Sequence, residues 1–88
     1  MTIAFSRHAA ADYRAWETED PAMAARLQAL IADVMDDPFQ GAGKPEALRG
    51  VLSGWWSRRI GREHRLVYRV AGRGTAAVLQ IAQCRYHP

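Results

Sequence analysis

Glu46 is one of two acids in a C-terminal half that is otherwise strongly basic, which makes it a candidate for proton transfer. A carboxylate surrounded by arginines usually stays ionised, and a general base has to be ionised to accept a proton. A surface salt bridge to Lys44 or Arg49 would explain the same residue without any chemistry. The other acid, Glu63, is typical of a turn and is the weaker candidate.

The penultimate residue, His87, is a candidate proton donor, because imidazole changes its charge near neutral pH. Pro88 restricts His87 to extended backbone, which continues the direction of a preceding strand. A histidine near a chain end is also commonly frayed and without function, so the residue type alone leaves both interpretations open. His8, expected in the first turn of a helix, and His64, expected at the start of a strand, are weaker candidates.

The charges are distributed unevenly along the chain. Residues 1–43 carry seven acids against three bases, whereas residues 44–88 carry nine bases against two acids. Eight of those nine bases are arginine, whose guanidinium group matches phosphate with paired donors. This imbalance indicates a polyanionic partner, and charge alone does not distinguish RNA, DNA and an acidic protein.

Residues 65–70 alternate between apolar and basic side chains, as a strand with one buried face does. Helices cover one face of such a sheet, so Arg65, Val67 and Arg69 are expected on the open face. Arg58 or Arg59 joins them from the neighbouring strand, depending on the register. Such a row of cations could hold the backbone of single-stranded RNA, or it could simply keep a solvated sheet face soluble.

Trp55 and Trp56 are adjacent in a predicted strand and therefore point to opposite faces. One of the two is expected in the core. The other is expected to be exposed, where it could stack on a base or contact a partner chain. Core packing together with a partner interface is the favoured interpretation.

Cys84 is the single cysteine, so the chain cannot form an internal disulfide, and a reducing cytoplasm is the expected location. Its expected role is that of a small buried apolar residue rather than a nucleophile. No Cys/His cluster has metal-ligand spacing, and no phosphate-binding loop or nucleophile elbow is present, so no metal or cofactor is expected. Neither a signal peptide nor an apolar run of the roughly 20 residues that span a membrane is present.

The elements that position these residues are expected to form one α+β domain over residues 1–88, with the helices packed on one face of an antiparallel sheet. The best-defined element is the second helix, where Asp20 caps the N-terminus, Pro21 occupies the first turn and an apolar stripe recurs at helical spacing. The predicted elements are a strand over 1–5, helices over 7–19 and 21–37, a loop over 39–45, strands over 55–60 and 65–70, a hairpin turn over 71–74 and a last strand from 76 to about 86.

Four segments carry a longer pattern than any single residue. They are Gly43-Lys44-Pro45-Glu46-Ala47-Leu48, Leu52-Ser53-Gly54-Trp55-Trp56-Ser57-Arg58-Arg59-Ile60, Glu63-His64-Arg65-Leu66-Val67-Tyr68 and Cys84-Arg85-Tyr86-His87. Together they resemble the YoeB (Txe/YoeB) toxins of the RelE-like superfamily of toxin–antitoxin modules. The resemblance extends over essentially the whole chain and includes Asp37-Pro38-Phe39 and the two-helix N-terminal half.

The resemblance implies a microbial-RNase-like α+β fold and a metal-independent endoribonuclease that cleaves mRNA in the ribosomal A site. In that family pattern the general base falls on Glu46, the phosphate-binding arginine on Arg65 and the general acid on His87. The substrate-binding positions implied are Arg59, Lys44, Arg58 and Tyr86.

The resemblance also implies partners. The expected ones are a YefM/Phd-like antitoxin and mRNA on the ribosome, with no membrane partner. A second copy of the chain is a further candidate that the sequence does not decide. The antitoxin is expected to be acidic and to compete for the arginine face. One departure is that the family commonly ends in His-Tyr, whereas Pro88 follows His87 here. A non-catalytic module that binds nucleic acid or an antitoxin is the alternative function.

Overall fold

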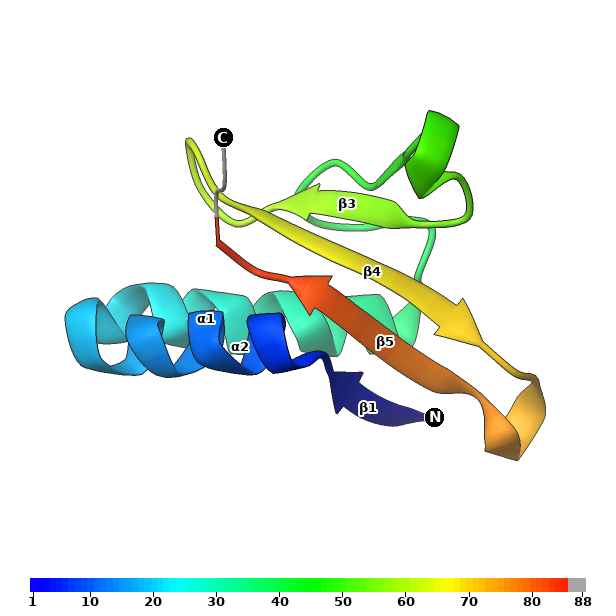
Figure 1. Ribbon diagram of the computed structural model, residues 1–88, viewed down its shortest axis with the longest axis horizontal. Helices are drawn as coiled ribbons and strands as arrows, with labels where there is room; N and C mark the ends of the chain where they lie inside the picture. The colour runs from blue at the N-terminus through cyan, green and yellow to red at the C-terminus, as the bar shows by residue number, and fades with distance from the viewer. Residues whose placement is uncertain (86–88) are drawn as a thin grey trace.

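Two helices pack on one face of a five-stranded sheet with the strand order β1-β5-β4-β3-β2 (Figure 1). The structure is a computed structural model and describes residues 1–85. This arrangement confirms the predicted α+β class. The elements are β1 (Thr2–Phe5), α1 (Arg7–Glu19), α2 (Pro21–Asp36), β2 (Glu46–Ala47), β3 (Trp56–Arg59), β4 (Arg65–Ala71) and β5 (Val78–Gln83), with 3₁₀ turns at Gly50–Leu52 and Gly74–Ala76.

Both helices begin at the caps that the sequence predicts. The Ser6 hydroxyl oxygen accepts a hydrogen bond from the Ala9 N–H at 3.0 Å, and the Asp20 carboxylate accepts one from the Met23 N–H at 3.2 Å. Pro21 occupies the first turn of α2, where its missing N–H costs no hydrogen bond. Within residues 1–85, neither helix is long and apolar enough to cross a membrane.

The sheet differs from the predicted antiparallel arrangement at β1, which pairs in parallel with β5 from Thr2 opposite Val78 to Phe5 opposite Ile81. The remaining neighbours are antiparallel. Alternation along a sequence indicates a strand but carries no information on the direction of its neighbour, which here lies at the other end of the chain. Figure 1 shows β1 beside β5 in this orientation.

The last strand is also shorter than predicted. Gly74–Ala76 form a 3₁₀ turn, so β5 begins at Val78 and ends at Gln83. Gly72, with a φ of +82°, lies within this connection, and a side chain there would meet the Ala76 carbonyl oxygen at 2.8 Å.

The core lies between the apolar stripe of α2 and the inward face of the sheet. Leu27, fully buried, lies on the stripe that the 3.6-residue period predicts, and the inward face of β4 and β5 is equally apolar. The buried side chains that α2, β4 and β5 contribute to this core are Leu27, Leu30, Ile31, Val34, Leu66, Tyr68, Leu79 and Ile81.

The segment that follows β5 is held against α1 by polar contacts. The Trp16 Nε1–H donates to the Cys84 carbonyl oxygen at 2.9 Å, and the buried Asp12 carboxylate accepts from the Cys84 N–H at 3.1 Å. Arg85 adds an ion pair to Glu19 at 2.7 Å and stacks over the Trp16 ring. Cys84 is fully buried, which confirms its predicted structural role.

Replacing Asp12 by Ala should lower the free energy of unfolding by about 1–3 kcal/mol, because the Cys84 N–H would stay buried without its acceptor. Urea denaturation followed by circular dichroism measures the change. Glu17→Ala, at an exposed position of the same helix, is the control and should cost less than about 0.5 kcal/mol. Equal losses in the two variants would contradict a role for the buried carboxylate.

Candidate functional site

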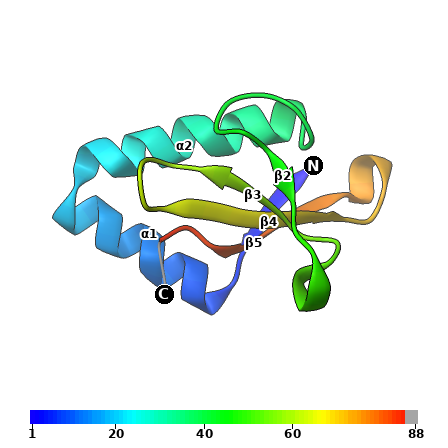
Figure 2. The ribbon, with the colours of Figure 1, turned by 90° about the horizontal axis from the view of Figure 1, so that it is seen from above.

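Strand pairing brings the predicted base and phosphate-binding residues to one face of the sheet. Glu46 on β2 lies opposite Ser57 on β3, and Arg59 on β3 lies opposite Arg65 on β4. Directly opposed residues present their side chains on the same face. Figure 2 looks onto the sheet, with β2, β3, β4 and β5 side by side.

The side chains meet as well as the strands. One Arg65 guanidinium nitrogen, Nη1, lies 3.7 Å from Glu46 Oε2 and donates to the Ser57 hydroxyl at 3.2 Å. Sequence reasoning missed Ser57, although strand alternation places it on the same face as Arg59. Ser57 is itself buried, with 1% of its surface exposed. The three residues form a compact polar group of carboxylate, hydroxyl and guanidinium.

The Glu46–Arg65 pair is open to solvent, with 68% of the Glu46 side chain and 44% of the Arg65 side chain exposed. An exposed pair of this kind contributes little to stability. Its exposure leaves the atoms of both side chains accessible to a ligand. Surface pairing with Lys44 or Arg49 was the alternative for Glu46, and the ion pair that forms joins it to Arg65 instead.

Arg59 and Lys44 border this group. Arg59 is exposed on the open face, and its backbone N–H donates to the Gly43 carbonyl oxygen at 2.7 Å. Lys44 is exposed too and has a φ of +53°, in the left-handed region that non-glycine residues rarely adopt. This left-handed residue directly precedes Pro45 and Glu46 in the chain.

Arg58 is a correction, since its predicted role in substrate binding is wrong. Its side chain lies on the inward face, fully buried, and its guanidinium is enclosed by protein groups. The acceptors are Asp33 Oδ2 at 2.5 Å, the Tyr68 hydroxyl at 3.1 Å, and the carbonyl oxygens of Asp37, Gln40 and Ala42. The sequence held a signal for this, because Arg58 shares its strand alternate with Trp56 and Ile60.

Two groups that contact this buried cation have shifted pKa values. The Ala42 N–H and the Arg58 guanidinium hold the pKa of Asp33 below its ordinary value. Burial raises the pKa of Tyr68, whose hydroxyl donates to the Pro38 carbonyl oxygen at 2.6 Å. The guanidinium is therefore paired with an ionised carboxylate and a neutral phenol.

The two tryptophans divide between the faces as predicted. Trp56 packs against the core and lies 5.0 Å from the Phe39 ring. Trp55 is half-buried rather than exposed, because the Arg69 guanidinium stacks over its ring at 4.4 Å. Arg69 also donates to Gln80 at 2.6 Å, so this arginine is already engaged by the protein.

The histidines are in different situations. His87 and Tyr86, predicted as general acid and substrate contact, lie outside the described residues. His8 lies 3.7 Å from Asp12, and His64 packs edge-on against the Trp16 ring at 4.6 Å. In the part of the chain described here, no group of three His, Cys, Asp or Glu side chains could hold a metal ion.

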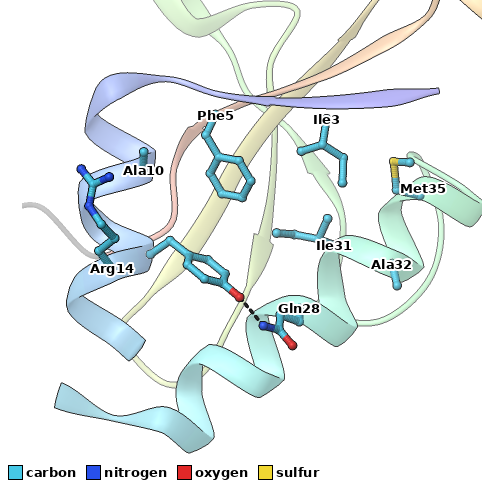
Figure 3. Close-up of a pocket in the computed structure, with 9 residues that line it drawn as sticks. Ile3, Phe5, Ala10, Arg14, Gln28, Ile31, Ala32 and Met35 are labelled. Carbon is cyan, nitrogen blue, oxygen red and sulfur yellow. Dashed lines mark hydrogen bonds between the residues drawn. The ribbon is translucent and has the colours of Figure 1, made fainter. Parts of the chain in front are cut away.

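A separate hollow of about 710 Å³ lies between β1 and the two helices (Figure 3). Ile3, Phe5 and Ile31 point into it, and Gln28 donates to the Tyr13 hydroxyl at its border. Its lining is mostly apolar and includes none of the residues of the Glu46 group, so we place the candidate chemistry on the sheet face. The lining residues are Ile3, Phe5, Ala10, Tyr13, Arg14, Gln28, Ile31, Ala32 and Met35.

Comparisons of sequence show which family the chain is similar to over nearly its whole length. Residues 5–88 match a family model described as the YoeB-like toxin of the bacterial type II toxin–antitoxin system. The chain is 49% identical over 87 residues to the toxin YoeB of Streptomyces coelicolor, covering 99% of each chain. It is 46% identical over 87 residues to the toxin YoeB of Escherichia coli K12, again covering 99% of each.

Comparisons of structure agree. A YoeB/ParE toxin from Agrobacterium tumefaciens superposes with a TM-score of 0.96 at 42% identity, covering 100% of both chains. The YoeB chain of a heterotetrameric YoeB–YefM complex from Staphylococcus aureus gives 0.88 at 37% identity, covering 100% of this chain and 98% of that one. The RelBE2 complex of Mycobacterium tuberculosis, at 23% identity and a TM-score of 0.70, shares the fold over 98% and 96% of the two chains.

The depressed pKa of Asp33 predicts a loss of stability in acid. The ionised carboxylate stabilises the fold above the ordinary Asp pKa of about 4, and this contribution disappears as the pH falls through the lower pKa of the folded state. The difference in unfolding free energy between the wild type and Asp33→Asn should therefore be constant from about pH 7 to 5 and shrink below about pH 4. Urea titrations across this range measure it, and a difference independent of pH would contradict the assignment.

Burial of Cys84 predicts a thiol that resists alkylation. Desolvation, with a further contribution from Asp12, raises the pKa of Cys84 to about 12, so very little thiolate exists near neutral pH. Iodoacetamide at about pH 8 should leave the native protein unmodified and label the urea-unfolded protein readily, since the free thiol has a pKa of about 8.5. Mass spectrometry distinguishes the two, and equal labelling rates would show that the thiol is accessible in the fold.

Proposed function

Because the chain belongs to the YoeB-like toxins of bacterial type II toxin–antitoxin systems, we propose that it is an endoribonuclease that cleaves mRNA in the ribosomal A site. The observation that supports this most directly is the exposed Glu46–Arg65 pair, with 3.7 Å between carboxylate and guanidinium. In RNA the 2′-hydroxyl is adjacent to the phosphodiester that it attacks. The base that deprotonates the hydroxyl and the cation that binds the phosphate must therefore lie next to each other, as Glu46 and Arg65 do.

In the proposed reaction Glu46 removes the proton from the 2′-hydroxyl, whose oxygen attacks the adjacent phosphorus. Arg65, helped by Arg59, stabilises the negative charge that grows on the phosphorane oxygens. The P–O5′ bond then breaks, and His87 donates a proton to the departing 5′-oxygen. The products are a 2′,3′-cyclic phosphate and a free 5′-hydroxyl. Each proton transfer is assigned to a side chain, so the proposed mechanism requires no metal ion.

The remaining predicted contacts hold the substrate. Lys44 is exposed two residues before Glu46, and we propose that its positive charge attracts the RNA backbone. Tyr86 is proposed to contact the substrate beside His87 on the ground of the family resemblance. Arg58 has no such role, because its guanidinium is buried among protein acceptors.

Two protein partners follow from the relatives. The S. aureus YoeB was solved both as a dimer and in a heterotetrameric complex with YefM. We propose that the partner of this chain is an acidic YefM-like antitoxin. Residues 44–88 contain nine bases and only two acids, and an acidic partner would complement this positive charge. We also propose that the chain can form a homodimer.

Replacing Glu46 by Gln should lower kcat for mRNA cleavage on translating ribosomes by about 10²- to 10⁴-fold, because the amide cannot accept the 2′-hydroxyl proton. Primer extension on a ribosome-bound message locates the cut and gives its rate. Glu63→Gln is the matched control, since it removes the other acid of the basic half, and its kcat should stay within about twofold of the wild type.

Two outcomes would overturn this proposal. Cleavage by Glu46→Gln at the wild-type rate would exclude Glu46 as the base. A wild-type protein that binds ribosomes or antitoxin and cuts no message would identify a non-catalytic binding module.

A further inference from the structure

We propose that Arg58 is a positioning residue that orders the segment 37–43 and thereby places Glu46 for proton transfer; this inference rests on the proposed function. The segment 37–43 connects the end of α2 to the turn that precedes β2. None of the hydrogen bonds of the Arg58 side chain goes to Glu46, Ser57 or Arg65, and three of its five acceptors lie in the segment 37–43.

All three nitrogens of the guanidinium are engaged, and most of their acceptors belong to one short stretch of chain. Nη2 donates to the carbonyl oxygens of Asp37 and Gln40, the latter at 3.0 Å. Nη1 donates to the Ala42 carbonyl oxygen at 3.2 Å and to Asp33 Oδ2. The segment therefore wraps around the buried cation, which supplies donors for carbonyl groups that a helix or strand would otherwise satisfy.

A hydrogen bond to Asp33 and two close backbone approaches also constrain the segment 37–43. Asp33 Oδ2, already bonded to Arg58, also accepts from the Ala42 N–H at 2.9 Å. The backbone at Gly41 passes so close that a Cβ atom there would collide with this carboxylate oxygen. A side chain on Gly43 would lie 2.7 Å from the Arg59 carbonyl oxygen. At Gly41 and Gly43 the backbone therefore lies where only glycine fits without a shift of neighbouring atoms.

Glu46 depends on this path because its own strand is very short. β2 has two residues and pairs with β3 only at Glu46–Ser57 and Ala47–Trp56. Arg59 and Arg65, by contrast, belong to longer strands inside the sheet. Loss of the Arg58 contacts should therefore displace the proposed base and leave Arg65, the main phosphate-binding residue of the proposal, in place on β4.

The shape of the guanidinium is as important as its charge. A planar fork presents five N–H donors in fixed directions, whereas an ammonium group presents three from one point. Lysine at this position would keep the positive charge opposite Asp33 and could not reach the Asp37, Gln40 and Ala42 carbonyl groups together. Arg58→Lys is thus the variant that removes positioning and retains the ion pair.

The test measures cleavage by Arg58→Lys at a temperature below its Tm, on message bound to ribosomes. We expect kcat to fall roughly 10- to 100-fold while KM stays within about twofold, because the base is misplaced and the phosphate contacts remain. Arg26→Lys is the matched control, since Arg26 also donates to a backbone carbonyl, that of Ile60 at 3.1 Å. Its kcat should equal that of the wild type.

A purely stabilising role predicts a different pattern. Arg58→Lys would then have a lower Tm and an unchanged kcat wherever it is folded, and that result overturns the proposal. A double-mutant cycle gives a second readout, because Arg58→Lys should cost nothing further once Glu46 is Gln. An equal loss in both backgrounds also overturns the proposal.

Hydrogen exchange separates this proposal from the proposed function. The amides of Ala42 and Arg59, which bond to Asp33 and Gly43, should exchange faster in Arg58→Lys, while those between β4 and β5 keep their rates. Unchanged exchange at both amides overturns the proposal even if cleavage is impaired. If wild-type protein cleaves no RNA, the proposed function fails and exchange still shows whether Arg58 orders the segment.

Should Arg58→Lys fail to fold, Asp33→Asn replaces it in the same measurements. Asparagine keeps the size of the Asp33 side chain and one acceptor oxygen but removes its charge, so it weakens the contacts to both Arg58 and Ala42 without removing the side chain between them. The expected fall in kcat is smaller and again disappears in the Glu46→Gln background. A kcat equal to that of the wild type overturns the proposal.

Discussion

The structure depends on satisfying one buried cation. Burying a guanidinium without acceptors would lower the stability of a protein by several kcal/mol. The folded chain must therefore place oxygen atoms around Arg58. The sheet itself supplies the Tyr68 hydroxyl, and the other acceptors come from Asp33 on α2 and from the segment 37–43. One side chain thus connects the helical layer, the irregular segment and the sheet.

A second set of polar contacts acts at the other end of the sheet. Asp12 and Trp16 bond to the N–H and carbonyl of Cys84, which fixes the segment after β5 against α1. Glu46 lies on a strand of two residues that follows the segment bound by Arg58, whereas Arg65 lies on the seven-residue strand β4 inside the sheet. Arg59 has both kinds of contact, since it pairs with Arg65 and its N–H donates to the Gly43 carbonyl oxygen. The proposed base and the proposed phosphate-binding Arg65 are therefore positioned by different contacts.

Local chemistry explains what could be predicted from the sequence. The caps at Ser6 and Asp20 and the stripe along α2 depend on residues a few positions apart, and the structure contains them as expected. The open-face location of Arg65 followed from alternation in the same way. The parallel pairing of β1 and the acceptors of Arg58 depend on residues distant in sequence, which no local pattern encodes. The roles of Glu46 and His87 came from the family resemblance, and the geometry of Glu46 is compatible with its role.

The parallel pairing of β1 and β5 has a consequence for synthesis of the chain. In the described part of the sheet, β5 is the neighbour of β1, so residues 2–5 cannot pair until residues 78–83 have been synthesised. Until then β4 also lacks its partner on one side. The sheet therefore cannot form stepwise from its first strand during translation, because the strand that joins β1 to the rest is made after all the others.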